Sequence, residues 1–173
     1  PGFLARPRRR VSAAERDDFR ERNAYWIDDW ARAAGPRAVD DQVRFDREWA
    51  ELRAHAADRG VRILGDVPYY VAPGAADVAA HPRLFRHDAV AGVPPDDFSA
   101  DGQLWGNPPY DWPAMRRDGY RWWIERLRRA RELWECSRID HFRGFVAWWA
   151  VPRRARTARR GRWMPGPGAA VIA

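Results

Sequence analysis

The sequence predicts an α/β fold in which two short strands lie parallel. The apolar patterns follow one another in the order helix, helix, strand, long loop, helix, strand. A strand–helix–strand order of this kind usually places its two strands parallel in one sheet. The chain has 173 residues, which is enough for one domain with a substantial core. We therefore expect residues 1–173 to form a single βαβ-containing unit.

Three stretches show the spacing of apolar side chains that is typical of helices. Residues 19–36 form the first and end at the pair Gly35-Pro36. Residues 45–60 form the second, with Gly60 as the C-terminal cap. Residues 115–135 form the third. Its expected apolar face consists of Trp123, Leu127, Ala130 and Trp134.

Two short runs have the β-rich composition of strands. Residues 61–71 read "VRILGDVPYYV", and residues 136–142 read "CSRIDHF". Between the first run and the third helix lies a stretch rich in Pro, Gly and Asp, which we interpret as a long loop over residues 72–112. A loop of that length inside a compact domain is usually functional or disordered, and its aromatic residues argue against disorder.

Composition favours a globular protein of a reducing compartment. Cys136 is the only cysteine, so an intramolecular disulfide cannot form. No apolar run approaches the roughly 20 residues of a membrane helix. The basic first ten residues are not followed by the apolar segment of a secretory signal. We expect a cytoplasmic location with no membrane contact.

The net charge of +7 raises the possibility of nucleic-acid binding. All of the excess comes from arginines that follow Asp140, which is also the last acidic residue of the chain. A run such as "RRARTARR" could follow phosphates, but a solvated surface segment is the more common explanation. We expect no nucleic-acid partner, and the sequence leaves the oligomeric state open.

Asp140 is the central candidate for chemistry. Because side chains alternate along a strand, Arg138 and Asp140 lie on one face and His141 on the other. A neighbouring guanidinium favours the ionised carboxylate. The end of a parallel strand is where α/β barrels place catalytic groups, and Asp66 holds the corresponding position on the first strand. A purely structural Arg–Asp pair that holds the strands together explains the pattern equally well.

An ionised aspartate in this position suits attack on the anomeric carbon of a sugar. A retaining enzyme also needs a second, protonated carboxyl group about 5 Å away. The upstream glutamates of the third helix are expected to face solvent or other helices, and no acid follows Asp140. The sequence therefore predicts a nucleophile without an acid partner.

The loop carries the residue types that bind sugars. The segment "GVPPDDFSADGQLWGNPPY" combines aromatic faces with paired polar groups, which suit the C–H faces and hydroxyl edges of a glucan. We favour substrate contact for Trp105, whereas Phe98 could equally pack the loop onto the domain. The candidate binding residues of the loop are Asp96, Phe98, Gln103, Trp105 and Asn107.

At these residues the chain resembles the amylomaltases, the 4-α-glucanotransferases of glycoside hydrolase family 77. The resemblance spans roughly residues 40–168. It rests on "ILGDVPYYVA", "DVAAHPRLF", "AGVPPDDFSADGQLWGNPPYDW", "RIDHFRGF" and "GRWMPGPG". It implies part of a (β/α)₈ TIM barrel, with residues 72–112 as a loop that covers the substrate. No metal or organic cofactor is implied, and the partners are α-1,4-glucans or maltooligosaccharides.

The resemblance also implies roles for individual residues. Asp140 matches the nucleophile that forms a covalent glycosyl-aspartate, and Arg138 matches its supporting arginine. His141 matches a histidine on the substrate side. Asp66 matches an acid of the preceding active-site strand, where Tyr70 is a further binding residue. Asp97 departs from the pattern, because the family usually has an aromatic residue at that position of the loop.

The family's acid/base glutamate and its third catalytic aspartate find no match in this chain. We therefore expect an internal piece of an amylomaltase that is inactive alone. The alternative is a non-catalytic, glucan-binding or degenerate fragment of such an enzyme.

Overall fold

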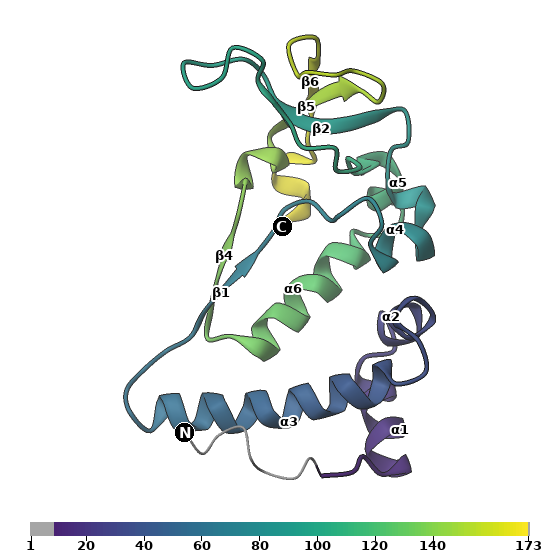
Figure 1. The fold of residues 1–173 in the computed structure, drawn as a ribbon, viewed down its shortest axis with the longest axis vertical. Helices are drawn as coiled ribbons and strands as arrows, with labels where there is room; N and C mark the ends of the chain where they lie inside the picture. Colours follow the sequence, from purple (N-terminus) through teal and green to yellow (C-terminus); the bar gives the residue numbers. More distant parts are fainter. Residues whose placement is uncertain (1–8, 173) are drawn as a thin grey trace. The chain divides into compact units, whose positions relative to one another are not determined.

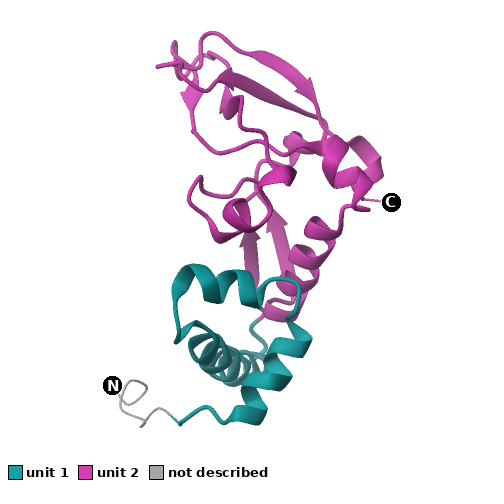
Figure 2. Cartoon of the chain, turned by 90° about the vertical axis from the view of Figure 1, so that its right-hand side faces the viewer, with its two compact units in different colours: residues 1–61 teal, residues 62–173 magenta. Residues whose placement is uncertain are grey.

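The computed structural model describes residues 9–172, which form two compact units (Figures 1 and 2). Residues up to Val61 belong to the first unit, and residues from Arg62 onward to the second. The first unit is helical, and the second contains all the strands of the described chain. None of the described helices combines the length and the apolarity that a membrane crossing requires.

The first unit consists of α1 (Ala13–Arg22), α2 (Ile27–Ala34) and α3 (Ala38–Ala57). All three contribute apolar side chains to one small core. The core consists of Val11, Phe19, Ile27, Val39 and Val43, with Trp26 and Ala31 packed against it.

The prediction of one helix over residues 19–36 is wrong, because the helix stops at Arg22 and a second begins at Ile27. The buried Asn23 explains the break. Its main-chain N–H and its side-chain amide both donate to the carbonyl of Phe19, at 3.0 and 2.9 Å. Its side-chain oxygen accepts from the Trp26 indole at 3.0 Å. An asparagine side chain that bonds its own backbone competes with helix propagation.

The second predicted helix exists but begins earlier, at Ala38 rather than Phe45. Its C-terminal end agrees with the expected glycine cap. Gly60 has a φ of +69°, its N–H donates to Ala57, and the N–H of Val61 donates to Ala56, both at 2.9 Å. These two bonds make a Schellman motif, which favours glycine at the left-handed position.

The second unit confirms the predicted parallel pair. Strands β1 (Leu64–Val67) and β4 (Cys136–Ile139) are parallel neighbours (Figure 1). Their register places Asp66 opposite Arg138. Helix α6 (Arg121–Leu133) precedes β4 and packs against both strands. A Cβ on Gly65 would lie 1.9 Å from the Trp134 ring, so only glycine lets the strand meet this aromatic.

The third predicted helix is divided in two. Helix α5 (Trp112–Arg117) ends before Gly119 and Tyr120, whose φ values are +60° and +56°, and α6 starts after them. On the expected apolar face, Trp123 and Ala130 are buried, as is Trp122. The glycine and the left-handed tyrosine interrupt the helix that the apolar spacing alone predicts as continuous.

The second sheet is antiparallel and was not predicted. Its strand order is β3 (Gln103–Leu104), β2 (Ala89–Val93), β5 (Ala147–Pro152), β6 (Arg162–Pro165). Three short helical turns complete the second unit together with helix α4 (Ala76–Ala80). They are η1 (Pro82–Leu84), η2 (Phe142–Phe145) and η3 (Gly168–Val171).

The expected loop over residues 72–112 thus contains α4, η1, β2 and β3. The part without helix or strand between β2 and β3 is residues 94–102, which project from the sheet (Figure 1). The covering of a substrate by this segment stays a prediction.

Candidate active site

The site begins with three charged side chains at the parallel pair of strands. Arg138 of β4 binds Asp66 of β1 with both ends of its guanidinium, from Nε to Oδ1 at 3.1 Å and from Nη2 to Oδ2 at 2.5 Å. Its third nitrogen, Nη1, lies 3.4 Å from Oδ1 of Asp140. Arg138 therefore stands between two carboxylates, and its bonds to Asp66 raise the pKa of the guanidinium.

Asp140 is open to solvent, with 58% of its side chain exposed. The carboxylate can therefore meet a ligand directly. Its main chain is fixed, because its N–H donates to the carbonyl of Val67 at 3.0 Å and so extends the parallel pairing by one bond. The site thus combines a fixed backbone with an accessible acid, which suits a reacting group.

The chain turns sharply after Asp140. His141 has a φ of +47°, a left-handed conformation that residues other than glycine rarely adopt, and η2 follows at once. Such conformations persist only where the surrounding structure holds them. The turn separates the two side chains, so that Asp140 stays in solvent and the His141 ring enters an aromatic cluster.

The aromatic cluster joins His141 to two predicted binding residues. The Trp105 ring meets the His141 ring edge-on, with centroids 4.8 Å apart, and Tyr70 lies about 6 Å from both. Burial lowers the pKa of His141 and outweighs the opposing effect of the Asp140 charge. The histidine is therefore a neutral, aromatic neighbour of Trp105 near pH 7.

Gln103 and Asn107 hold the backbone and rings around this cluster. The Gln103 side-chain oxygen accepts from the Trp105 indole at 3.0 Å. The Asn107 amide donates to the carbonyl of Val71 at 2.8 Å and ties the segment after β3 to the segment after β1. Gln103 thus orients the Trp105 ring, whereas the described contact of Asn107 is structural.

Asp96 and Phe98 lie in a separate turn, and none of their described contacts reaches the Asp140–Trp105 group. Asp96 accepts from the N–H groups of Phe98 and Ser99 at 3.0 and 2.9 Å. This turn presents Phe98 to solvent with 96% of the residue exposed. A large aromatic side chain held outward by a tight turn is available for an external contact.

Tyr69 and Arg126 support the aromatic cluster and were not among the predicted site residues. Tyr69 is buried among six aromatic rings, including those of His141 and Phe145 at 5.9 and 4.9 Å. Arg126 of α6 donates to the Tyr69 carbonyl at 3.2 Å and lies over the Trp122 and Trp123 rings. The signal was present in the adjacent aromatics of "VPYYV", which follow β1 and of which Tyr69 is buried.

No second carboxyl group with a proton to donate is placed beside Asp140 in the described chain. Asp66 uses both oxygens to accept from Arg138. The α6 acids Glu125 and Glu132 pair with Arg128 and Arg129, at 2.6 and 3.0 Å. Within residues 9–172, no three His, Cys, Asp or Glu side chains gather in a way that could hold a metal ion. The site offers a carboxylate and an aromatic surface.

Comparisons with known proteins identify the family of the chain. The family model described as 4-alpha-glucanotransferase matches residues 40–173. The 4-alpha-glucanotransferase of Streptococcus pneumoniae serotype 4 is 44% identical over 165 residues, which are 90% of this chain and 33% of that protein. The chloroplastic/amyloplastic enzyme of Arabidopsis thaliana is 49% identical over 140 residues, which are 78% of this chain and 24% of the plant protein.

Solved structures give the same answer for the fold. An amylomaltase from Streptococcus agalactiae in complex with acarbose has a TM-score of 0.75 and 35% identity, over 92% of this chain and 37% of that one. An amylomaltase from Corynebacterium glutamicum has a TM-score of 0.83 over 92% of this chain and 26% of its own, and at 24% identity it shows the fold alone.

The chain spans about a third or less of the length of these curated relatives. The family model nevertheless matches well over half of it, and the relatives agree with one another. The resemblance seen in the sequence is thereby confirmed, and the chain belongs to the 4-alpha-glucanotransferase (amylomaltase) family, glycoside hydrolase family 77.

Proposed function

We propose that this chain carries the nucleophile and part of the glucan-binding surface of a 4-α-glucanotransferase built on a (β/α)₈ barrel. One observation carries the proposal. Asp140 lies at the carboxyl end of a parallel strand, forms an ion pair with Arg138, and precedes His141, whose ring packs against Trp105. In a parallel α/β barrel this end of the strands is where chemistry takes place.

In the proposed reaction, Asp140 attacks the anomeric carbon of an α-1,4-linked glucose unit. The bond to O4 of the leaving glucan breaks, O4 takes a proton from a general acid, and a covalent glycosyl-aspartate forms. The 4-hydroxyl of a second glucan then attacks the same carbon, gives its proton to that group acting as a base, and releases Asp140. Arg138 helps to orient the carboxylate before attack, because its Nη1 lies 3.4 Å from Oδ1 of Asp140.

The aromatic side chains supply the binding surface. Sugar rings stack their C–H faces on aromatic side chains. Trp105 is partly exposed, packs against His141, the residue after Asp140, and has its indole N–H oriented by Gln103. Phe98, the exposed middle residue of the 94–102 segment, would close over the glucan. This closure would limit the access of water and so favour transfer over hydrolysis.

The departure of O4 in the first half-reaction needs a proton donor, and the attack of the second glucan needs a base that takes up its hydroxyl proton. No acidic residue follows Asp140 in the sequence, and the described upstream glutamates of α6 pair with arginines. We expect the 173-residue polypeptide to bind glucan and not to transfer it. A glucan-binding, non-catalytic polypeptide is therefore the second candidate function, favoured by this lack of a donor.

Binding is tested with acarbose, the ligand of the Streptococcus agalactiae amylomaltase, and with maltoheptaose. Calorimetric titration of the chain should give saturable binding that Trp105→Ala weakens about tenfold, since stacking of this kind is worth roughly 1–2 kcal/mol. Trp30→Ala removes a partly exposed tryptophan of the first unit and should leave affinity unchanged. Equal losses for the two variants would contradict the assignment of Trp105.

Chemistry is tested by incubating the chain with maltotriose. We expect no glucose and no longer maltooligosaccharides by chromatography. Disproportionation that disappears in Asp140→Asn would show that the polypeptide has its own proton donor. Disproportionation that survives Asp140→Asn would remove the nucleophile assignment.

A further inference from the structure

A groove of about 650 Å³ opens on the antiparallel sheet of the second unit, and its lining includes none of the candidate active-site residues. Strands β2, β5 and β6 contribute to it together with residues 159–162. Its charged and aromatic lining residues are Arg86, Asp88, Trp148, Arg159, Arg160 and Arg162. The volume lies within the range of small-molecule sites.

The groove carries a clear excess of positive charge, with four guanidinium groups against one carboxylate. Arg86 and Asp88 neutralise each other through two hydrogen bonds, at 3.0 and 2.5 Å. Arg159 binds Asp101 at 2.6 Å. Within the described chain, neither Arg160 nor Arg162 has an acidic group at ion-pair distance, and the charge of Arg162 acts on Asp88 only from further away. Both guanidinium groups can therefore still bind a ligand.

The backbone that bears these two arginines is held in place. The buried Ala158 donates its N–H to Asp101 at 3.0 Å and accepts from the Trp149 indole at 2.9 Å. A Cβ on Gly161 would lie 2.5 Å from Trp149 and 2.7 Å from the Ala150 carbonyl, so glycine permits the close approach. Arg162 opens β6 opposite Ala150. A fixed backbone lowers the entropic cost of binding.

The guanidinium fork matches the geometry of phosphate oxygens, and paired arginines are a common means of holding a dianion. The remaining wall includes Pro152 and Met164, which can meet the C–H face of a sugar. A single hollow differs from the extended basic stripe along which nucleic acids bind. The charge and the size together therefore favour a small phosphorylated ligand over a polymer.

We propose that Arg160 and Arg162 form a binding site for the phosphate monoester of a small sugar, separate from the Asp140 site. The site does not depend on the proposed transferase function. Arg86 and Arg159 line the same hollow, and their pairing with Asp88 and Asp101 keeps them in place.

The test is calorimetric titration of the chain with glucose 6-phosphate, inorganic phosphate and glucose at constant ionic strength. We expect glucose 6-phosphate to bind more tightly than inorganic phosphate, and glucose not to bind. The double variant Arg160→Gln, Arg162→Gln should raise the Kd at least about tenfold, since it removes both charge-assisted hydrogen-bond donors. The matched control is Arg154→Gln, Arg156→Gln, which removes the same charge from exposed positions outside the groove.

Equal weakening in the two double variants would overturn the site, because it would show a response to net charge alone. Inorganic phosphate that binds as tightly as glucose 6-phosphate would remove the sugar from the proposal. Tighter binding of an oligonucleotide, lost in Arg160→Gln, Arg162→Gln, would replace it with a nucleic-acid site. Acarbose binding is measured in parallel, so failure of either proposal is seen independently of the other.

Discussion

Tyr69 and Gly144 meet directly beneath the Asp140 turn. A Cβ placed on Gly144 would lie 2.5 Å from two carbons of the tyrosine ring and 2.9 Å from its hydroxyl. The hydroxyl itself is buried and has no hydrogen-bond partner among the described residues. The two residues fill the space under η2 and leave one polar group, the Tyr69 hydroxyl, without a hydrogen bond. The position of the turn depends on this contact between Tyr69 and Gly144.

Gly144→Ala should therefore destabilise the protein by about 1–3 kcal/mol, the usual cost of overpacking a core. Gly74→Ala is the matched control. The space around Gly74 is open and its φ is not positive, so alanine there should be neutral or slightly stabilising. Urea unfolding followed by tryptophan fluorescence measures both. A loss at Gly144 no larger than that at Gly74 would contradict the contact.

Tyr69→Phe removes the unpaired hydroxyl and keeps the ring. Because the buried oxygen gains no hydrogen bond, we expect this variant to be as stable as the parent or more stable, by up to about 1 kcal/mol. Urea unfolding followed by tryptophan fluorescence measures the change in unfolding free energy. Destabilisation beyond about 1 kcal/mol would show that the hydroxyl has a partner.

His141 gives the second unit a pH response. Burial lowers its pKa below the ordinary value of 6.5, so the folded state holds the neutral ring and the unfolded state takes up the proton. The stabilisation from the neutral ring is present above pH 6.5 and decreases as the pH falls. The unfolding midpoint of the second unit should therefore decrease between pH 7.5 and pH 5.5.

His141→Asn should flatten this response, and asparagine tolerates the left-handed backbone at this position. His55→Gln changes an exposed histidine of the first unit and should leave the response intact. Thermal unfolding at a series of pH values tests the comparison. An unchanged slope in His141→Asn would assign the pH effect to another group.

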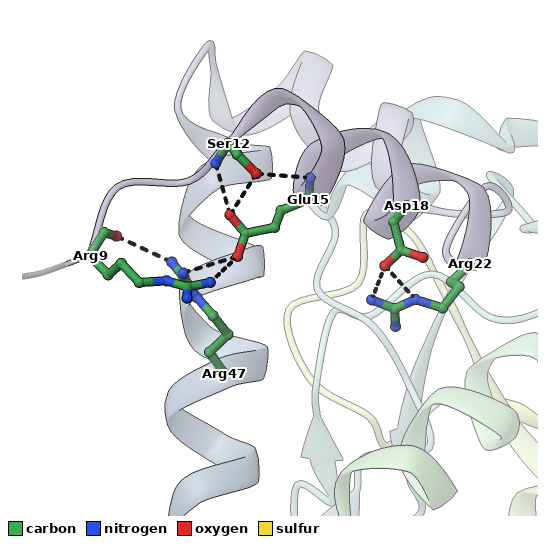
Figure 3. A network of polar contacts seen from close by, with 6 residues as sticks. All are labelled: Arg9, Ser12, Glu15, Asp18, Arg22 and Arg47. Atoms are coloured by element: carbon green, nitrogen blue, oxygen red, sulfur yellow. Dashed lines mark hydrogen bonds and ion pairs between the residues drawn. The ribbon is translucent and has the colours of Figure 1, made fainter.

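At the scale of elements, α1 depends on a capping box (Figure 3). The Ser12 hydroxyl accepts from the Glu15 N–H at 3.2 Å, and the Glu15 carboxylate accepts from the Ser12 N–H at 2.9 Å. Arg47 of α3 also reaches Glu15, at 3.2 Å. The hydrogen bonds from Ser12 lower the pKa of Glu15 to about 2, so in the folded state the carboxylate stays ionised down to about that pH.

Ser12→Ala should cost about 1 kcal/mol, the usual value of an N-cap. Arg22→Ala breaks the exposed pair with Asp18 in the same helix and should cost less than about 0.5 kcal/mol. Helix content followed by circular dichroism during urea unfolding separates the two. Similar losses would mean that the hydrogen bonds of the cap add nothing beyond surface charge.

The same cap predicts behaviour in acid. Because the folded pKa of Glu15 is below its ordinary 4.5, its contribution is complete above pH 4.5 and is lost as the pH falls toward 2. Glu15→Gln should remove this loss of helix between pH 4.5 and 2. A pH dependence of the helix content that Glu15→Gln leaves unchanged would contradict the hydrogen bonds between Ser12 and Glu15.

The elements also show what local sequence can and cannot predict. The parallel strands and the glycine end of α3 follow from residue types, because apolar runs and glycine caps act over a few neighbours. The breaks at Asn23 and at Gly119-Tyr120 do not, since each depends on hydrogen bonds or dihedrals that the apolar spacing ignores. The antiparallel sheet joins β2 to β5, which are far apart in sequence, and short strands give no pairing signal.

At the scale of the whole molecule, every candidate active-site residue lies in the second unit. The first unit has its own core around Ile27, which is fully buried. Each unit thus has a separate source of stability, and the glucan-binding surface we propose requires only one of them.

Ile27→Ala should destabilise the first unit by about 2–5 kcal/mol without changing acarbose affinity under conditions where the protein stays folded. Phe145→Ala, in the aromatic core under the site, should reduce both stability and affinity. Unfolding curves and calorimetric titrations are compared for the two variants. A loss of affinity in Ile27→Ala would show that the first unit takes part in binding.

The candidate site was predictable to the extent that it depends on strand geometry. Alternation placed Arg138 and Asp140 on one face, and the salt bridge between them agrees. Sequence could not predict that Arg138 gives its closer bonds to Asp66, because that pairing arises from the register of two distant strands. Nor could it predict that Asn107 is used to hold Val71.

The hydrogen bond from the Asp140 N–H to the Val67 carbonyl limits the positions that the carboxylate can reach. With the main chain pinned, only two side-chain torsions adjust its oxygens, and productive alignment tolerates about 0.5 Å. A glutamate at this position would keep the charge and overshoot the target by a methylene. If Asp140 is the nucleophile that we propose, the length of the side chain, rather than its acidity, is the property that cannot change at this position.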